Sequence, residues 1–271
     1  MTIADVLADT TPAATLRADL ANMRDFWSRY GRAPGRELHE TPDVTWVVTG
    51  IHDALLNGIF HFTATDADAD RAIASILDHF RGRDLPLQWM VTSSMRPSDL
   101  SERLAAHGMT HLFDAPGMAI DLATMADPPL PEGLTIHRVR DRPMLEAWDR
   151  VGLTCFEVAE RLHPEVIDLE ESLGLDWSLP SRRYLAMLDG KTVATSMVHY
   201  HAGVAGIYFV GTLPEARGRG IGAAITVAPL KEARALGYRI GVLQASPMGL
   251  PVYKRLGFQE HARYQLYVAG E

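Results

Sequence analysis

Cysteine is almost absent from this sequence, and that absence excludes two kinds of stabilisation. Cys155 is the only cysteine among 271 residues, so the chain can form neither an internal disulfide nor a cysteine-based zinc cluster. No long apolar run precedes the first basic residue, Arg17, so we see no signal peptide and expect a soluble, cytoplasmic protein without a membrane partner. The 47% hydrophobic content suffices for packed cores, and the length predicts one or two domains.

Two common phosphate-binding signatures are also missing. The sequence contains neither G-x-x-x-x-G-K-[S/T] nor G-x-G-x-x-G, which argues against a P-loop or a dinucleotide-binding fold. The formal net charge of −8 argues against a general nucleic-acid binder. The charge is uneven, because residues 213–271 hold eight Lys/Arg against four Asp/Glu. A basic segment on an acidic chain suits an anionic cofactor and a cationic amine substrate, although solubility alone could explain the acidity.

The most informative stretch is residues 210–222, V-G-T-L-P-E-A-R-G-R-G-I-G. The apolar residues 204–209 before it predict a buried strand, and residues 223–236 after it predict a helix that ends at Gly237. Amide groups at a helix start lack intrahelical partners and lie at the positive end of the helix dipole. A glycine loop in front of them therefore predicts a phosphate-binding site, because glycines allow close approach and the two arginines add charge.

Two motifs in this part of the chain carry a family resemblance. The run R-x-x-G-x-G begins at Arg217, three residues after Pro214, and Y-K-R-L-G-F begins at Tyr253. Together they resemble the acyl-CoA loop and the Y-x-x-L-G-F segment of the GNAT superfamily of N-acyltransferases, over residues 183–268. The resemblance implies an α/β fold (α+β, with a mixed sheet) in which a central, mostly antiparallel sheet is flanked by helices. It also implies acetyl-CoA as the acyl donor substrate and no metal.

The resemblance further implies roles for individual residues. In this family the strand before the loop offers its backbone to the thioester, which implies the Val210 N–H as oxyanion donor and Thr212 as a pantetheine contact. Ser246 stands where the family usually has asparagine, so its contact with the pantetheine arm is an open expectation. The residues expected to hold the pyrophosphate are Arg217, Gly218, Arg219, Gly220, Ile221 and Gly222.

Tyr253 matches the tyrosine that faces the CoA sulfur in this family, and we expect it to donate a proton. A phenol has an ordinary pKa near ~10, so at neutral pH it is a donor rather than a base. The general base stays open between His199 and His201 on one strand, Glu157 and Glu160 on a helical stretch, and water. Cys155 as an acyl-carrying nucleophile is disfavoured, because nothing in the sequence activates it.

The N-terminal half repeats the order of elements of the C-terminal half. Superposing Gly108 on Gly257 places Asp68 where Arg217 stands, between Asp66 and Asp70, and places Leu104 where Tyr253 stands. We therefore predict two GNAT-like domains, with a degenerate one at 1–126, a proline-rich linker at 127–133 and a catalytic one at 134–271. Carboxylates in place of the loop cations should repel a pyrophosphate.

The sequence favours an acetyl-CoA-dependent N-acetyltransferase that acylates a primary amine of a small molecule by direct attack in a ternary complex. The alternative is a non-catalytic acyl-CoA sensor or interaction module, because residues 204–212 lack the glutamate that many family members carry. The tandem architecture also resembles mycothiol synthase and the aminoacyl-tRNA-using peptidoglycan transferases. The latter need a basic tRNA surface, which the net charge disfavours. The sequence leaves the amine, the acyl length and the oligomeric state open.

Overall fold

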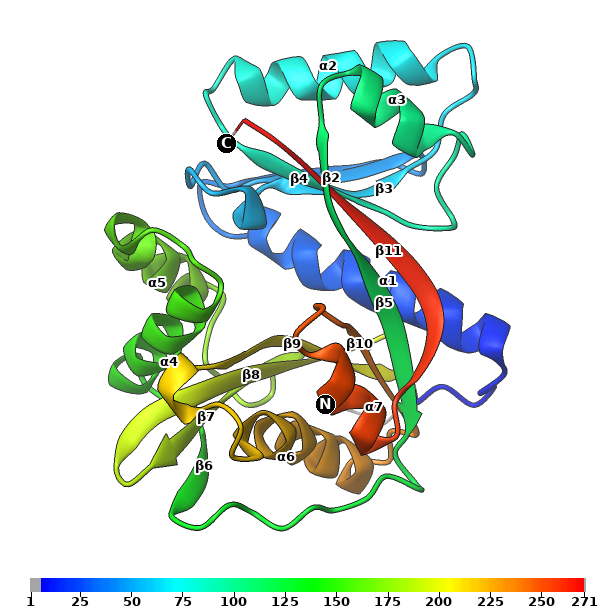
Figure 1. The fold of residues 1–271 in the computed structure, drawn as a ribbon. Coiled ribbons are helices and arrows are strands. Elements are labelled where there is room, and N and C mark those ends of the chain that lie inside the picture. Colours follow the sequence, from blue (N-terminus) through cyan, green and yellow to red (C-terminus); the bar gives the residue numbers. More distant parts are fainter. Residues whose placement is uncertain (1–5, 271) are drawn as a thin grey trace. The chain divides into compact units, whose positions relative to one another are not determined.

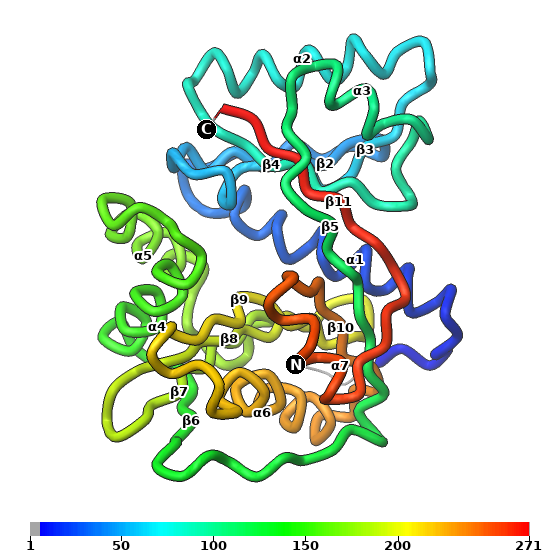
Figure 2. The backbone as a smooth tube through the Cα atoms, in the orientation of Figure 1, coloured from blue at the N-terminus to red at the C-terminus, as the bar shows by residue number. Residues whose placement is uncertain are grey.

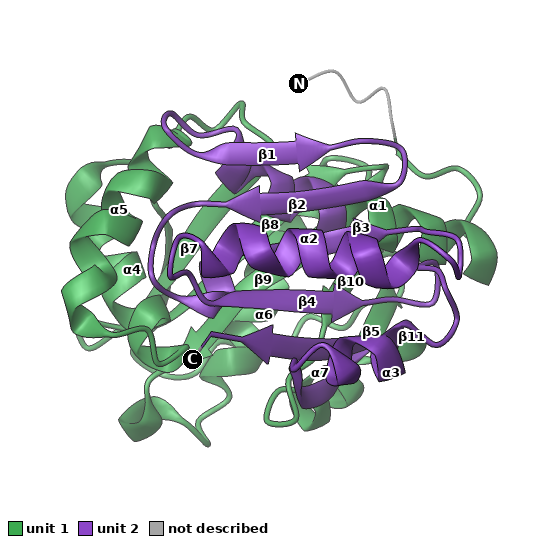
Figure 3. Ribbon diagram, turned by 90° about the horizontal axis from the view of Figure 1, so that it is seen from above, with its two compact units in different colours: residues 1–22, 117–261 green, residues 23–116, 262–271 purple. Residues whose placement is uncertain are grey.

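The structure is a computed structural model that describes residues 6–270, and the chain divides into two compact units (Figure 3). Unit 1 comprises Met1–Asn22 and Gly117–His261, and unit 2 comprises Met23–Pro116 and Ala262–Glu271. These units do not follow the limits expected from the sequence, 1–126, 127–133 and 134–271. Residues 126–131 form no helix or strand, as expected of a linker, but they lie inside unit 1.

Unit 1 is built on a mixed sheet in which one pair of neighbouring strands, β9 and β10, is parallel. The other neighbours in the sheet are antiparallel, which confirms the fold class predicted from the sequence. In spatial order the strands are β5 (Thr110–Asp121), β10 (Ile240–Gln244), β9 (Val204–Thr212), β8 (Lys191–His201), β7 (Ser181–Leu188) and β6 (Leu134–Arg138).

Helices cover both faces of this sheet (Figure 1). Successive strand residues point to opposite faces, and the neighbours Thr195 and Ser196 show which helix covers which face. A Cβ at Gly152 of α4 would lie 3.6 Å from Thr195 Oγ1, whereas Ser196 Oγ donates to the Ile225 carbonyl of α6 at 2.8 Å. The helices of this unit are α4 (Arg142–Cys155), α5 (His163–Ser172), α6 (Ile221–Ala235) and α7 (Leu250–Leu256), with short 3₁₀ turns at Glu160–Leu162 and Pro214–Ala216.

Local sequence signals fix the ends of these helices. The Asp141 carboxylate accepts from the Met144 N–H at 2.9 Å, so it caps the start of α4. Gly257, just after α7, has φ +98°, a left-handed conformation that glycine adopts without strain. Between sheet and helix, Val198, Ile207, Ile225 and Leu243 belong to one apolar core.

The first part of α1 (Pro12–Gly31) belongs to unit 1 and contributes a buried polar contact there through Asn22. Its side-chain amide donates to the carbonyls of His199 (3.0 Å), His201 (3.2 Å) and Val204 (3.4 Å), and its carbonyl accepts from the Tyr208 hydroxyl (2.8 Å). A residue far away in the sequence thus satisfies backbone groups at the β8–β9 turn.

Unit 2 repeats this pattern on a smaller scale. Its strands are antiparallel neighbours except for the parallel pair β3–β4, with α2 connecting that pair as α6 connects β9 to β10. The elements of this unit are β1 (Glu37–Glu40), β2 (Val44–Val48), a 3₁₀ turn (Ala54–Leu56), β3 (Gly58–Phe62), α2 (Ala69–Arg81), β4 (Leu87–Val91), α3 (Leu100–Ala106) and most of β11 (Gln259–Ala269).

Each unit is completed by a strand that follows the other unit's short helix. β5 follows α3 in the chain, yet its residues 117–121 pair with β10 in unit 1. β11 follows α7, yet its residues 265–269 pair with β4 in unit 2. Figure 2 allows both connections to be traced along the chain. Among residues 6–270, no helix is long and apolar enough to cross a membrane.

This strand exchange predicts that residues 130–271 do not fold alone. Such a fragment loses residues 117–121, which leaves the backbone of β10 unpaired at a buried sheet edge, and it loses the Asn22 link. We expect it to be aggregated or molten, judged by size-exclusion chromatography and near-UV circular dichroism against the full chain. A monomeric 130–271 fragment with native-like near-UV signal and full activity would contradict this expectation.

Candidate functional site

The site begins where the parallel strands β9 and β10 stop pairing. Their last paired residues are Ile207 and Leu243. Beyond this point β9 continues to Thr212 against β8, while β10 continues to Gln244 against Gly117 of β5. In the described strand pairing, residues 208–212 of β9 therefore have no partner on β10. Backbone groups exposed between two separating strands are available to a ligand.

A β-bulge lies at the start of this separation. Thr195 pairs with Gly211 and Met197 with Tyr208, so Phe209 and Val210 stand opposite Ser196 alone. Phe209 has φ +48°, an uncommon conformation for an aromatic residue, and its carbonyl accepts from the Thr195 hydroxyl at 3.0 Å. The bulge thus re-aims the backbone around Val210, the expected oxyanion donor.

The glycine loop follows directly and is open to solvent. Gly218 and Gly220 have φ +75° and +78°, and residues 217–220 are exposed. Gly220 precedes α6 without a side-chain cap, and the first intrahelical bond runs from Ala224 N–H to Gly220 O. The amides of residues 221–223 therefore precede the helical ladder, at the positive end of the α6 dipole.

Arg217 is anchored beside this helix start. Its Nε donates to the Thr212 carbonyl at 2.9 Å, which ties the loop to the end of β9. One hydrogen bond thus joins Thr212, which we expect to contact the pantetheine arm, to Arg217, which we expect to contact the pyrophosphate. Arg219 is exposed two residues further on. The structure brings Val210, Thr212 and residues 217–222 into one continuous strand–loop–helix segment.

Tyr253 lies on α7 and is 8% exposed in the same apolar core against which Val210 packs. Burial raises the pKa of Tyr253 to about 12, against a smaller lowering by the Thr226 hydroxyl of α6. The phenol is therefore protonated throughout the physiological range and suited to donate a proton. Thr226 is a neighbour that the sequence reasoning missed, because only the packing of α6 against α7 brings the two residues together.

Ser246 has a local structural role in this structure. Its hydroxyl accepts from the Gly249 N–H at 3.1 Å, and its carbonyl accepts from Gly249 and Leu250. The residue therefore forms the turn that starts α7 and positions Tyr253 four residues after Gly249. Its contact with a pantetheine arm stays a prediction.

The two histidines expected as base candidates lie on β8, away from the bulge. His199 is buried, its Nδ1 lies 2.8 Å from the Ser181 hydroxyl, and it pairs with Gly206. Gly206 lies four residues before Val210, which is roughly 13 Å along a strand. His201 pairs with Val204, further still, and its ring stacks on His199. This register gives neither histidine close access to the Val210 backbone.

Glu157, unlike the two histidines, follows directly after a residue that contacts the bulge. Phe156, the residue before it, contacts the Phe209 ring edge-on with centroids 5.4 Å apart. Glu157 is exposed and has φ +59°, directly after the end of α4. Glu160 begins the next 3₁₀ turn and is also exposed. Of the titratable candidates, Glu157 is thus the one adjacent to a side chain that touches the bulge.

Cys155 packs against β9 rather than standing ready as a nucleophile. A Cβ at Gly211 would lie 2.8 Å from Cys155 Cβ and 3.1 Å from its Sγ. Burial raises the pKa of the Cys155 thiol, with a smaller opposing effect of Arg217. A protonated thiol is a poor nucleophile, so the structure gives no support to a covalent acyl-enzyme.

In unit 2 the corresponding strands, β3 and β4, also separate, but the segment after β4 hydrogen-bonds to the freed backbone of β3. β3 and β4 pair only at Gly58–Gln88 and Ile59–Trp89. Arg96 then bridges Thr63 in parallel, its N–H donates to the Phe62 carbonyl and its carbonyl accepts from Ala64 N–H. These hydrogen bonds occupy the backbone that a pantetheine arm would need.

The side chains expected to exclude a cofactor from unit 2 lie as follows. Leu104 is fully buried, so it offers no proton donor. Asp68 is paired with Arg71 at 2.5 Å, and Asp70 with His107 at 3.0 Å and with Arg103. The guanidinium groups of Arg71 and Arg103 partly cancel the carboxylate charge. Unit 2 therefore combines a hydrogen-bonded backbone at this position with carboxylates whose charge is partly compensated.

A separating parallel pair, a bulge and a glycine loop at a helix start are the features of unit 1 that the sequence resemblance to the GNAT superfamily predicts. Residues 180–260 match the family model of the acetyltransferase (GNAT) domain. This chain therefore carries a GNAT acetyltransferase domain.

The similarity of this chain to known proteins is not confined to residues 180–260. A curated relative, the mycothiol acetyltransferase of Streptomyces avermitilis, is 29% identical over 153 residues, which are 53% of this chain and 48% of the relative. The chain thus spans about half the length of the curated relatives that it matches. A GCN5-related N-acetyltransferase from Kribbella flavida has a similar fold, with a TM-score of 0.71 at 20% identity over 96% of both chains. A tandem GNAT protein from the clavulanic acid biosynthesis pathway gives 0.57 at 15% identity, over 98% of this chain and 97% of its own.

Proposed function

We propose that this protein is an acetyl-CoA-dependent N-acetyltransferase that acylates a primary amine of a small molecule in a ternary complex. The observation that carries the proposal is the separation of β9 from β10 after Ile207 and Leu243, directly before the Arg217–Gly222 loop and beside the Tyr253 core. A pantetheine arm can extend along the unpaired edge of β9 while the pyrophosphate lies at the start of α6.

Each part of the cofactor then has a complementary group. The amides of residues 221–223 and the Arg217 guanidinium face the pyrophosphate charge. The backbone of residues 210–212 pairs with the pantetheine amides as a strand would. Gly218 has no atom within 4 Å of an added Cβ, and Gly220 only Pro131 Cγ at 3.7 Å, so phosphate oxygens have room beside the loop.

The chemistry requires three proton and charge movements. The neutral amine attacks the thioester carbonyl, and the Val210 N–H stabilises the oxyanion that develops. The attacking nitrogen loses a proton to Glu157, to Glu160 or to water. The C–S bond breaks, and the departing thiolate takes a proton from the Tyr253 hydroxyl, which burial keeps protonated.

The acceptor binds, in this proposal, on the α4 side of the bulge. Phe209 contacts Trp148 and Phe156 edge-on at centroid distances of 6.0 and 5.4 Å, and Phe156 is 39% exposed. These rings form an apolar wall, and the exposed Glu157 beside it suits a cationic amine. The relatives named mycothiol acetyltransferases support a small-molecule acceptor.

A second candidate function is a non-catalytic acyl-CoA sensor, favoured by the lack of a carboxylate on β9. The two functions are separated by following thiol release from acetyl-CoA over a panel of small amines. A turnover that depends on one amine supports the enzyme. Tight CoA binding without turnover on any amine supports the sensor.

The loop gives a charge-specific prediction. Gly220→Asp should abolish CoA binding measured by calorimetry, because its carboxylate enters the pyrophosphate site. Gly220→Asn is the matched control, because asparagine also tolerates the left-handed conformation and is neutral, so it should retain measurable binding. Arg217→Ala should weaken binding about 10- to 100-fold through loss of a charge-assisted hydrogen bond. Wild-type affinity in Gly220→Asp would disprove the loop assignment.

Tyr253→Phe should lower kcat by ~10²–10⁴ and leave the acetyl-CoA dissociation constant nearly unchanged, because only the proton donor is lost. Initial-rate kinetics should be sequential. The matched control is Cys155→Ser, which we expect to keep kcat within a few-fold of wild type. An acetylated protein trapped in the absence of amine, and lost in Cys155→Ser, would replace this mechanism with a covalent one.

Unit 2 should not bind the cofactor, because Arg96 closes the gap between β3 and β4. Calorimetric titration with CoA should give one site per chain. Gly220→Asp should remove that single site and leave none. Two sites in the wild type, or one remaining in Gly220→Asp, would show that unit 2 binds CoA.

A further inference from the structure

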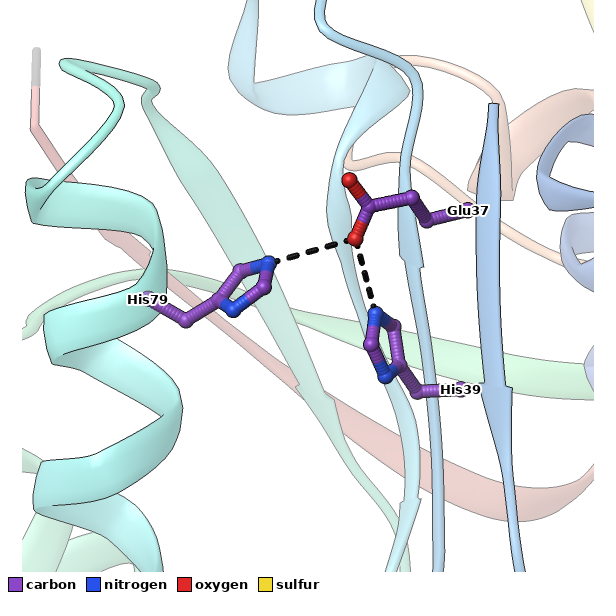
Figure 4. A group of neighbouring side chains, drawn as sticks. All are labelled: Glu37, His39 and His79. Atoms are coloured by element: carbon purple, nitrogen blue, oxygen red, sulfur yellow. Dashed lines mark hydrogen bonds and ion pairs between the residues drawn. The ribbon is translucent and has the colours of Figure 1, made fainter. Parts of the chain in front are cut away.

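Three side chains of unit 2 converge on one point at the edge of its sheet (Figure 4). Glu37 and His39 lie on β1, two residues apart and therefore on the same face of the strand. His79 lies in the last turn of α2. Glu37 Oε2 is 2.9 Å from His39 Nε2 and 3.3 Å from His79 Nε2. Within residues 6–270, no other group of three or more His, Cys, Asp or Glu offers ligand atoms that lie together in this way.

Hydrogen bonding alone does not account for this arrangement. Both imidazoles direct Nε2 at the same carboxylate oxygen, although Glu37 has a second oxygen, which lies 3.4 Å from Arg83. His79 Nε2 is buried and meets no hydrogen-bond partner of suitable geometry among the described residues, despite its short distance to Glu37. The contact of His79 Nε2 with Glu37 is thus an ion-pair distance of 3.3 Å without good hydrogen-bond geometry, and a buried ring nitrogen in this situation gains from a better partner.

The surroundings fix the two rings in place. His39 stacks flat on Trp46, with centroids 3.7 Å apart and planes at 9°. His79 meets the same Trp46 ring edge-on at 4.6 Å. One indole thus orients both imidazoles, and the site is preorganised before any ligand arrives.

We propose that Glu37, His39 and His79 bind a divalent transition-metal ion of the Zn²⁺ type. Two ligands of a tetrahedral zinc lie roughly 3.3 Å apart, and all three ligand atoms here lie within 4.8 Å of one another. Small side-chain movements therefore suffice to enclose an ion. A neutral imidazole is the common form above pH ~6.5 and is a good ligand for zinc.

The ligand set selects among metals. Two nitrogens and one carboxylate oxygen suit Zn²⁺, Co²⁺, Ni²⁺ or Cu²⁺, whereas Mg²⁺ and Ca²⁺ prefer oxygen ligands only. The three ligands leave a fourth position for water. The ion would join β1 to α2 and so stabilise unit 2, separately from the acyl-transfer chemistry, for which the sequence implied no metal.

The test titrates the untagged, metal-free full chain with Zn²⁺ against a chromophoric chelator, and with Co²⁺ by visible absorption. We expect one high-affinity site per chain, with a dissociation constant on the order of micromolar or below. His39→Ala and His79→Ala should each weaken Zn²⁺ binding about 100-fold and abolish the Co²⁺ absorption. His52→Ala is the matched control, an exposed histidine of the same unit, and should change neither.

Glu37→Gln keeps the size of the side chain and one accepting oxygen but removes its charge. It should preserve the far-UV circular dichroism and still weaken Zn²⁺ binding, which separates a lost ligand from a lost fold. Zinc should also raise the unfolding temperature of the wild type and not that of His79→Ala. The proposal is overturned if the wild type binds no Zn²⁺ in this range, or if affinity in His39→Ala and His79→Ala equals that of His52→Ala.

Discussion

The separation of β9 from β10 is the constraint on which the candidate site depends. A central sheet normally pairs every backbone group, and here the pairing stops at Ile207 and Leu243 although both strands continue. The sheet tolerates this because each strand keeps its other neighbour, β8 for β9 and β5 for β10. The bulge at Phe209 turns the β9 backbone, while Ile207 of β9 and Leu243 of β10 remain in the α6 core. The site therefore costs the protein a few backbone hydrogen bonds, which a ligand can restore.

The same separation in unit 2 shows how such a site is lost without loss of the fold. Strands β3 and β4, helix α2 and helix α3 repeat the order of β9, α6, β10 and α7. The difference lies in the segment after β4, where Arg96 supplies the backbone hydrogen bonds that a cofactor would otherwise make. Carboxylates at the start of α2 add to this, although Asp68 and Asp70 are paired with cations. If the proposed CoA site in unit 1 is correct, a few residues of backbone distinguish the unit that binds CoA from the one that does not.

Local features of the fold were predictable from the sequence, and long-range ones were not. The strand before the glycine loop and the helix after it are specified by neighbouring residues, and both form in the predicted part of the chain, the helix as Ile221–Ala235. By contrast, the buried Asn57 side chain bonds Thr49, Ile51 and Pro86, and no local pattern specifies these contacts. The partners of β5 and β11 depend on strands more than 100 residues away, and no local pattern specifies them. The distance of His199 from Val210 required the register of β8 on β9, which alternation of side chains does not give.

The strand exchange makes the folding of unit 1 depend on chain segments that lie outside residues 134–271. Unit 1 needs a strand beside β10, and the chain supplies it from β5, which follows α3. It also needs a group for the carbonyls at the β8–β9 turn, and Asn22 of α1 supplies it. Neither requirement involves the loop at Asp66–Asp70 or the position of Leu104. Substitutions in those segments therefore leave these contacts intact, whereas loss of residues 117–121 or of the Asn22 amide removes them. The segments that unit 1 needs for its fold are thus different from the segments of unit 2 that correspond to the proposed cofactor site.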